Sequence, residues 1–409
     1  MALRLALLLL LPGAAGLTCQ DAALRAEPFC DATLPVSERV ADLLPRLNVS
    51  QMLGQMTGIG PAIPELGVVE YNYGGEALHG IWSTCVNASD GSLKCPTQFG
   101  SPLSMSCSFN RRLWRAMASA TSTEVRAFYD FAAAGGESAK SLEGLPFGLS
   151  YYTPNINIMR DPRWGRSEET PGEDPYLNGE YGYAFTKGFQ EGDDDDEDDQ
   201  QGRIEEGKER FGTSYWKANV VVKHFVAYSL ETSTIPSYAN HGADPSQGEG
   251  GGFINRHAFN AIVSDQDLLE TYLPAFHRAV DADAGGIMCS YSQYLVRISP
   301  GSMPALTRSI DPCVCADAIN GVPACVNSEM LRGVLRGDFR FNGIVATDCG
   351  ALNDAQVNHN YSKALCPSCN TTAQADLIAS LAVKAGVDSN CGSFMTSHMP
   401  GAQHLILSR

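Results

Sequence analysis

Long apolar runs are absent from most of this 409-residue sequence. After residue 16, no segment reaches the run of about 18 apolar residues that a membrane-spanning helix needs. The N-terminus, MALRLALLLLLPGAAG, has one Arg, an apolar stretch from Leu5 to Leu11 and small residues from Gly13 to Gly16. This pattern predicts a cleaved signal peptide at residues 1–16. We therefore expect a secreted protein, in the extracellular space or the cell wall, without stable membrane insertion.

Positive charge is also scarce. The chain has 29 Lys and Arg against 46 Asp and Glu, a formal net charge of -17. Phosphate binding requires a basic face, so nucleic acid is excluded as the expected partner. Seven consecutive acids, Asp193 to Asp199, supply much of the excess. Such a run favours a solvated, disordered insert over about residues 191–212 rather than a calcium or partner site.

Cysteine, in contrast, is plentiful, with 13 residues. In a secreted chain this number favours disulfides, and the odd count leaves at least one thiol unpaired. The CPSC segment with Cys366 and Cys369 could be a redox or zinc pair, but no His pair lies nearby at ligand spacing, so we expect a structural disulfide. Four glycosylation sequons agree with passage through the secretory route, at Asn48, Asn87, Asn360 and Asn370.

From about residue 150, short apolar runs alternate with amphipathic helical stretches, which predicts an α/β fold with a parallel sheet. The expected strands are 153–158, 219–225, 285–291 and 343–347. The expected helices are 110–129, 264–280, 328–337 and 371–386. In the second of these, Ser264 has the position of an N-cap. One face of that helix should be buried through Leu268, Leu269, Tyr272, Leu273 and Phe276.

Polar side chains end several of these strands, where an apolar core would reject them. Lys223 and His224 follow a Val run, Tyr291 follows Ile287 and Met288, and Asp348 follows Ile344 to Ala346. In a closed barrel of alternating strands and helices, such residues converge at the carboxyl ends of the strands and build an active site. Asp348 has an alternative role as the N-cap of the next helix.

The segment NINIMRDPRWGRSEETPGEDP, residues 155–175, resembles the signature of glycoside hydrolase family 3, and within it the β-xylosidase branch. Further matches follow in the family's order: EALHG (76–80), VVKHFVAY (221–228), residues 256–276 with IMCSY (287–291), and residues 320–349. The resemblance covers about residues 40–390. It implies a TIM-like (β/α)8 barrel, the family's N-terminal domain, over residues 17–395, followed by a tail at 396–409.

The resemblance also implies a retaining exo-glycosidase that removes terminal β-D-xylosyl residues from xylan-derived oligosaccharides, without cofactor or metal. In such enzymes one carboxylate attacks the anomeric carbon and a second carboxyl group protonates the leaving oxygen. The match of ATDC to the nucleophile motif assigns the first role to Asp348. The oligomeric state is not predicted.

Substrate-binding roles follow from the same matches. Lys223 and His224 correspond to the pair that donates hydrogen bonds to sugar hydroxyls, and their charge should hold Asp348 ionised; a salt bridge in the barrel core is the alternative. The other expected contacts are Arg166, Tyr291, Tyr152 and Arg256, of which the last two could instead serve in packing. Glu76 corresponds to a Glu that leaves no room for the hydroxymethyl group of glucose, unless it is merely an exposed acid. His79, beside it, could be a core histidine.

Three features depart from the family pattern. The stretch from Gln190 to Tyr215, which contains the acidic run, is interpreted as an insertion. The general acid/base of the family comes from an α/β sandwich domain after the barrel, which we expect to be absent from this chain, either because the gene model is truncated or because the barrel has little activity. Residues 292–319 form an insertion after MCSY, interpreted as a surface loop near Tyr291 or an intron read through.

Other functions remain open. Within the family these are a β-glucosidase or an α-L-arabinofuranosidase; the hexosaminidase branch fits less well, because FVAYSLE stands where that branch has a Gly-rich loop. Outside enzymes, a catalytically weak or inactive sugar-binding barrel or a structural cell-wall protein is the alternative. The last of these leaves the strand-end polar residues unexplained.

Overall fold

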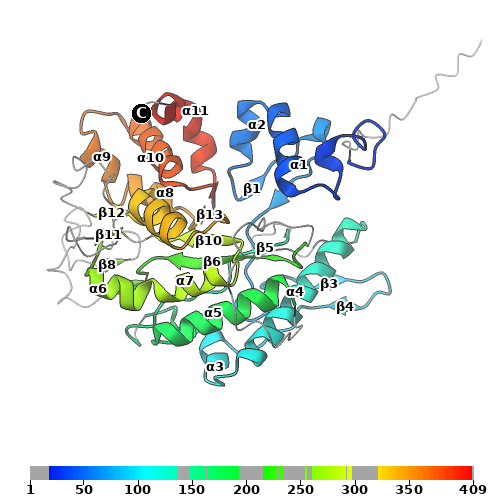
Figure 1. Ribbon diagram of the computed structural model, residues 1–409, viewed down its shortest axis with the longest axis horizontal. Helices are drawn as coiled ribbons and strands as arrows, with labels where there is room; N and C mark the ends of the chain where they lie inside the picture. The colour runs from blue at the N-terminus through cyan, green and yellow to red at the C-terminus, as the bar shows by residue number, and fades with distance from the viewer. Residues whose placement is uncertain are drawn as a thin grey trace, which may run out of the picture.

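A curled parallel sheet lies at the centre of the molecule (Figure 1). Its strand order is β14 (Ser389–Asn390), β13 (Ile344–Thr347), β10 (Gly286–Cys289), β6 (Asn219–Phe225), β5 (Ser150–Tyr151). The computed structural model describes residues 18–407 apart from 137, 139, 141–147, 163, 193–214, 229, 234–253, 256–259, 292 and 297–320. The four neighbouring pairs are all parallel, as the alternation of apolar runs and helices predicts.

An N-terminal segment, Met56 to Gly75, connects the two edges of this sheet. At one edge, Asn390 N donates to Met56 O (2.9 Å) and Gly58 N donates to Asn390 O (2.8 Å). At the other edge, Tyr152 N donates to Gly75 O (2.6 Å). Within the segment, β1 (Ile59–Gly60) pairs antiparallel with β2 (Tyr71–Asn72). The curled α/β sheet was therefore predicted correctly, although the described residues place five parallel strands in it rather than eight.

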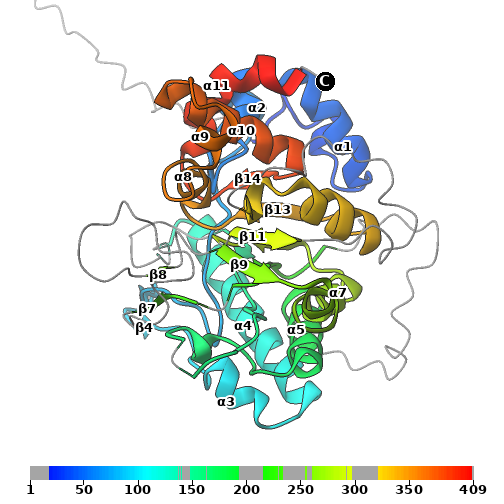
Figure 2. The same cartoon turned by 90° about the vertical axis from the view of Figure 1, so that its left-hand side faces the viewer.

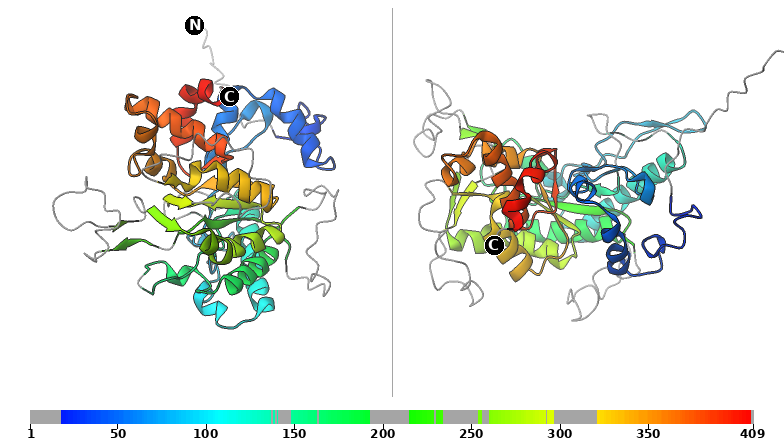
Figure 3. Two further views of the ribbon diagram at one scale, coloured as in Figure 1. Left: turned by 60° about the vertical axis from the view of Figure 1, so that its left-hand side comes forward. Right: turned by 90° about the horizontal axis from the view of Figure 1, so that it is seen from above.

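Helices cover both sides of the sheet (Figures 1 and 2). One group contains α4 (Arg111–Ala133), α5 (Pro175–Gln190) and α7 (Pro274–Asp281). The rings of Trp114 in α4 and Tyr181 in α5 pack together, and Tyr181 continues a row of rings along α5 with Phe185 and Phe189. The other group contains η10 (Glu329–Asp338), α8 (Ala351–Gln356), α10 (Thr371–Ala385) and α11 (Phe394–Leu407). Seen from above, α11 lies beside α2 (Val49–Gly54), so early and late parts of the chain are neighbours (Figure 3).

Small elements complete the structure. The short sheets are β3–β4 (Val86–Asn87, Leu93–Lys94), β7–β8 (Thr232–Ser233, Ile254–Asn255) and β12–β11–β9 (Val322–Pro323, Gln293–Val296, Asn260–Val263). The short helices are α1 (Val36–Leu43), α3 (Pro102–Ser106), α6 (Asp265–Asp267), α9 (Tyr361–Leu365) and the π-helix η6 (Leu268–Tyr272). Single 3-10 turns are η1 (Pro28–Cys30), η2 (Leu44–Arg46), η3 (Pro64–Leu66), η4 (Ser167–Glu169) and η9 (Ala324–Val326).

Most predicted elements occur where the sequence places them, with four corrections. The strand expected at 153–158 lies upstream, as β5, and residues 153–158 contribute only a bridge from Asn155 to Lys223. The helix at 264–280 begins with Ser264 as N-cap but divides at Pro274, which cannot donate a backbone hydrogen bond. Leu269 is exposed rather than buried, because the π-helical turn rotates it away from the core. The insertion after Tyr291 starts with strand β11 rather than a loop.

Five disulfides connect described cysteines and confirm the expectation drawn from the cysteine count. The pairs are Cys19–Cys30, Cys85–Cys95, Cys289–Cys325, Cys349–Cys391 and Cys366–Cys369. The CPSC cysteines are thus joined by a disulfide, and Cys107 is a free, exposed thiol. Such a set of disulfides indicates a protein of the secretory pathway or the extracellular space. The signal peptide and the acidic run lie outside the described residues.

Candidate active site

Asp348 lies directly after β13, at the carboxyl end of the sheet. Its backbone N–H donates to Cys289 O (2.9 Å), which holds it beside the end of β10. Side-chain Oδ1 accepts from Cys349 N–H (2.8 Å), whereas Oδ2 has no hydrogen-bond partner among the described residues. Helix α8 has Gly350 as its N-cap and receives no side-chain cap. The helix-cap interpretation of Asp348 is therefore wrong.

The environment of Asp348 favours its protonated form. Burial raises the pKa of this carboxyl group to about 6, because a carboxylate loses solvation when it leaves water. Four groups lower this pKa, but burial has the larger effect. They are Arg166, the Cys349 N–H, Lys223 and Tyr291. The charge of Lys223 thus acts in the expected direction, toward an ionised Asp348, although burial outweighs it. At neutral pH most of the population still carries the carboxylate that a nucleophile needs.

Lys223 and Glu76 form an ion pair near Asp348. Lys223 Nζ donates to both carboxylate oxygens of Glu76, at 2.8 and 2.6 Å. Lys223 is 3% exposed, while the Glu76 side chain is 32% exposed toward a cavity. Burial raises the pKa of Glu76 and the charge of Lys223 lowers it. Glu76 is therefore an ion-paired acid rather than a solvated one. Its partner, Lys223, is the one lysine of β6 and lies 147 positions away in sequence.

Asn157 sets the orientation of His224. Asn157 Oδ1 accepts hydrogen bonds from the His224 backbone N and from ring Nδ1, both at 2.9 Å, and Asn157 Nδ2 donates to His224 O (2.8 Å). An amide oxygen only accepts, so Nδ1 carries a proton. The other ring nitrogen, Nε2, then faces Asp348 Oδ2 at 3.6 Å.

Arg166 is braced by a carboxylate and an aromatic ring. It forms two hydrogen bonds with Glu169, Nε to Oε1 and Nη2 to Oε2, both at 2.7 Å. Its Nη1 donates to the Tyr228 hydroxyl (3.3 Å), and its guanidinium carbon is 5.4 Å from the centre of the Tyr228 ring. The charge of Arg166 lowers the pKa of Asp348, so the two groups are within electrostatic range.

The turn after Asp348 is fixed from two sides. A disulfide joins Cys349 to Cys391, which follows β14. The Tyr291 hydroxyl donates to Cys349 O (2.7 Å), and Cys391 N donates to Thr347 Oγ1 (3.1 Å). These contacts orient the Cys349 N–H that holds Asp348 Oδ1.

A cavity of about 960 Å³ opens at this end of the sheet. Among its lining residues are Glu76, Tyr152, Trp82 and Cys349. The pKa of Tyr152 is raised by burial and by the charges of Glu76 and Asp348, so its phenol ring stands near both carboxyl groups. The volume is in the range of small-molecule sites, about 300–1,000 Å³.

Comparison with known proteins identifies the family. Residues 97–391 match the model of the glycosyl hydrolase family 3 N terminal domain. The chain belongs to glycoside hydrolase family 3. It is 31% identical to β-xylosidase/α-L-arabinofuranosidase 1 of Medicago sativa subsp. varia over 91% of its length, and 31% identical to probable β-D-xylosidase 7 of Arabidopsis thaliana over 91%. The chain spans 38% and 39% of the lengths of these two relatives.

Solved structures of family 3 enzymes share the fold. One is the exo-β-xylosidase XlnD in complex with a xylobiose aziridine activity-based probe, with 26% identity and a TM-score of 0.69 over 97% of this chain and 41% of that chain. A β-glucosidase from Listeria innocua in complex with isofagomine aligns with 21% identity and a TM-score of 0.55, over 91% of this chain and 43% of that one. The resemblance to family 3 and the relation to β-xylosidases are thus confirmed.

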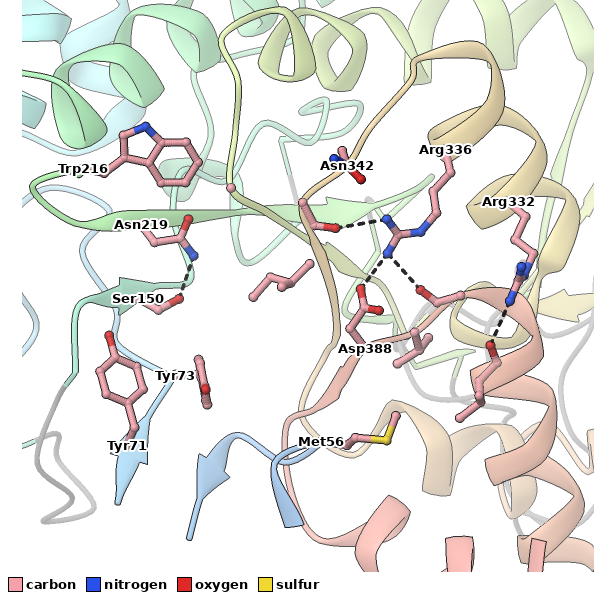
Figure 4. A pocket seen from close by; sticks show the side chains of 16 residues that line it. Met56, Tyr71, Tyr73, Ser150, Trp216, Asn219, Arg332, Arg336, Asn342 and Asp388 are labelled. Atoms are coloured by element: carbon pink, nitrogen blue, oxygen red, sulfur yellow. Dashed lines mark hydrogen bonds and ion pairs between the residues drawn. The ribbon is translucent and has the colours of Figure 1, made fainter. Parts of the chain in front are cut away.

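A second cavity, of about 890 Å³, lies at the opposite end of the family 3 sheet (Figure 4). It is lined by the first residues of strands, including Ser150, Asn219 and Ile344. Arg336 there donates to Asp388 Oδ2 (2.6 Å), Gly343 O and Gly386 O. Active sites of parallel barrels occur at the carboxyl ends of strands, and the donors of Arg336 are engaged in joining β13 to β14. This cavity therefore belongs to the supporting end of the domain.

The structure brings together most of the residues expected to bind substrate. Those around the Asp348 end of the sheet are Glu76, Tyr152, Arg166, Lys223, His224 and Tyr291. Arg256 lies outside the described residues. His79, beside Glu76, has its Nδ1 3.1 Å from Phe99 O. The roles of these residues toward a sugar remain predictions.

Several supporting residues were missed by sequence reasoning. Asn157, Glu169 and Tyr228 orient His224 and Arg166, and each stands within a motif that was recognised. A buried Asn in the apolar run 155–158 was the available signal for the first of them. No cluster of three or more His, Cys, Asp or Glu with metal-binding geometry occurs in the described part of the chain. Within the same ranges, no helix is long and apolar enough to cross a membrane.

Proposed function

We propose that this chain is the (β/α)8 barrel domain of a retaining exo-glycosidase that acts on terminal β-D-xylosyl residues, with Asp348 as nucleophile. The position of the Asp348 carboxyl group carries the proposal: Oδ1 is held by the Cys349 N–H, while Oδ2 is buried and without a partner among the described residues. An unsatisfied carboxylate oxygen is costly in a folded protein. A site in which this oxygen attacks a sugar explains why that cost is retained.

In the proposed reaction, Asp348 Oδ2 forms a bond to the anomeric carbon as the bond to the leaving oxygen breaks. A proton must reach that oxygen, and water then cleaves the glycosyl ester. The resemblance assigns the proton donor to a domain that follows the barrel. We assign the Asp348 barrel the tasks of attack and recognition.

Recognition would use the groups already fixed around Asp348. Lys223 Nζ keeps a third proton beyond the two that it donates to Glu76, and the oxygens of Glu76 keep lone pairs. Arg166 adds further N–H donors, and His224 presents Nε2, which accepts from a hydroxyl when the imidazole is neutral and donates to one when it is protonated. We propose that the Glu76–Lys223 pair fills the space that a hydroxymethyl group would need, which favours xylosides over glucosides.

Turnover of an aryl β-xyloside tests the nucleophile, because a phenolate leaves with little help from an acid. Asp348→Ala should abolish turnover, and added azide should restore it and give an α-xylosyl azide. Asp354→Ala, which removes a buried acid of α8, is the matched control and should keep turnover. Full activity of Asp348→Ala would contradict the assignment.

Comparison of aryl β-xyloside, β-glucoside and α-L-arabinofuranoside tests the substrate. We expect the xyloside to be hydrolysed fastest. A clear preference for the glucoside would exclude the proposed role of Glu76. Binding of xylose or xylobiose by calorimetry without hydrolysis of any of the three would favour a sugar-binding domain instead.

A further inference from the structure

His359 is a buried histidine outside the group of residues assigned to the sugar. It follows helix α8 and is only 4% exposed. Its ring Nε2 lies 3.0 Å from Tyr291 O, a contact between positions 68 apart in sequence. A carbonyl oxygen only accepts, so Nε2 carries a proton and donates to this carbonyl. Burial of an imidazole is costly without a hydrogen bond, and the bond to Tyr291 O offsets part of that cost.

Helix α8 joins the proposed nucleophile to His359. Gly350, the N-cap of α8, stands two positions after Asp348. At the other end of the helix, Val357 N donates to Asn353 O (2.8 Å) and closes the last turn just before His359. The chain between Asp348 and His359 is thus one short helical segment, which limits how far the two can move apart.

Tyr291 lies beyond the end of its strand and is held from two directions. Strand β10 ends at Cys289, and its pairing with β13 ends at the same residue. Tyr291 is nevertheless only 7% exposed, and its hydroxyl donates to Cys349 O (2.7 Å). The hydrogen bond from His359 thus holds the backbone of Tyr291, while Cys349 holds its hydroxyl.

These contacts form a closed path around Asp348. From Asp348 the chain runs through α8 to His359. His359 binds Tyr291, and Tyr291 binds the turn at Cys349 again. The Cys349 N–H in that turn donates to Asp348 Oδ1 (2.8 Å). The Tyr291 hydroxyl and this N–H both lower the pKa of Asp348, so a shift of Tyr291 would change the ionisation of the carboxyl group as well as its direction.

We propose that His359 is a positioning residue for the Asp348 nucleophile and acts through Tyr291. This inference rests on the proposed function. His359 holds Tyr291 O, the Tyr291 hydroxyl holds the turn at Cys349, and that turn fixes Asp348 Oδ1 so that Oδ2 points at the anomeric carbon. His359 itself contacts neither the sugar nor the reacting oxygen.

The pH dependence of aryl β-xyloside turnover tests this path, because the acid limb of kcat/KM reports the pKa of the nucleophile in the free enzyme. His359→Phe keeps a ring at this position but cannot donate to Tyr291 O. We expect kcat to fall about ten- to a hundredfold with little change in KM, as for a misplaced reacting group. The acid limb should also move from about pH 6 to higher pH.

Two further substitutions at the same position separate the hydrogen bond from the size of the side chain. His359→Gln, whose amide can still donate to Tyr291 O, should restore most of the turnover and the original acid limb. His359→Asn, with an amide one methylene shorter, should behave like His359→Phe and replaces it if that variant does not fold.

His398→Phe is the matched control. His398 Nδ1 lies 3.1 Å from Asp376 Oδ1, so this histidine also joins two segments, α11 and α10. Its loss should lower stability and leave the acid limb in place. The other ionisable groups that face Asp348 are unchanged in all the single variants; they are Arg166, Lys223, His224, Tyr152 and Tyr291.

A double variant tests the route through Tyr291. Tyr291→Phe removes the hydroxyl that reaches Cys349 O, so it should raise the acid limb by itself. Adding His359→Phe should then move the limb no further, and an additive shift overturns the route. An unmoved acid limb in His359→Phe, even with lower turnover, overturns the positioning role and leaves His359 a purely structural residue.

Urea unfolding separates this inference from the function on which it rests. If the parent hydrolyses no aryl glycoside, the proposed function is overturned. Comparison with Asp348→Asn then still gives the pH at which the stability from protonated Asp348 is lost, and this pH should be higher in His359→Phe than in the parent. The same pH in both overturns the positioning of Asp348 as well.

Discussion

The ring of His224 faces Asp348 with Nε2 3.6 Å from Oδ2, while Asn157 holds the other ring nitrogen in place. This separation exceeds a hydrogen bond, so the histidine does not satisfy the carboxylate. Arg166 and Lys223 stabilise the charge of Asp348, but the loss of solvation on burial outweighs them. This balance has a consequence that depends on pH.

Asp348 should make the fold less stable as pH rises. Its folded pKa of about 6 lies above the usual value, about 3.9, so the folded state holds the proton more tightly than the unfolded state between these values. The contribution of Asp348 to the free energy of unfolding is therefore fully present below about pH 4 and is lost as pH rises through 6. It amounts to about 3 kcal/mol. Urea unfolding should therefore show Asp348→Asn to be more stable than the parent at pH 8 and equal to it at pH 4.

The control for this pH series is Asp90→Asn. Hydrogen bonds from Ser92 lower the pKa of the exposed Asp90 carboxyl group, so its contribution should have the opposite sign and disappear on acidification. A pH-independent difference between Asp348→Asn and the parent would contradict the predicted burial of the charge.

The Lys223–Glu76 pair should show strong coupling in a double-mutant cycle. Lys223→Met leaves the Glu76 carboxylate without its cation and should cost about 2–3 kcal/mol, less than the 3–5 kcal/mol of fully buried pairs because Glu76 is a third exposed. Adding Glu76→Gln to this variant removes the stranded charge and should recover at least half of the loss. Additive effects of the two changes, measured by denaturant unfolding, would mean that the pair is not coupled.

The Cys349–Cys391 disulfide should affect activity as well as stability. Its cysteines are 42 positions apart, and replacing both with Ala should cost about 4 kcal/mol by loss of the loop constraint. Turnover should also fall, because Cys349 N–H holds Asp348 Oδ1. Replacing Cys366 and Cys369, which are 3 positions apart, should cost about 2 kcal/mol and leave turnover unchanged. Equal effects of the two replacements on turnover would contradict a role for the Cys349 turn.

The sequon at Asn370 combines two functions that substitution can separate. Asn370 is exposed, and its side chain accepts from Ala373 N (2.9 Å) as the N-cap of α10. In a host that glycosylates secreted proteins, Asn370→Ser should remove the mass of one glycan and keep the cap, whereas Asn370→Ala should also lose about 1 kcal/mol. Mass spectrometry and thermal unfolding distinguish these results. If neither variant lost the mass of a glycan relative to the parent, the sequon would be shown not to be used.

Local patterns predicted the centre of the sheet well and its edges poorly. Strands β6, β10 and β13 each contain a buried apolar run, so the run itself marks them. The edge strands β5 and β14 have two residues each, too few for any periodicity. Helix α5 was missed although Asp174 and Pro175 form a usual helix start, because it is almost entirely buried and lacks an amphipathic pattern.

The candidate site, too, could be predicted only as far as local sequence patterns reach. Strand-end residues such as His224 and Asp348 could be grouped from sequence, because parallel strands bring their carboxyl ends together. The pairing of Lys223 with Glu76 joins positions 147 apart and has no local signal. The raised pKa of Asp348 depends on how much protein surrounds it, which only the folded chain determines.

The placement of Met56–Gly75 between β5 and β14 has a consequence for the order of folding. This early segment hydrogen-bonds to a strand near residue 150 and to one near residue 390, so its second neighbour is synthesised long after the segment itself. During translation, the backbone at Met56–Gly58 and the edge at β13 lack these partners until Ser389 and Asn390 leave the ribosome. Completion of the sheet is therefore a late, long-range step in folding. Until it occurs, the unpaired strand edges are surfaces that a chaperone would need to cover.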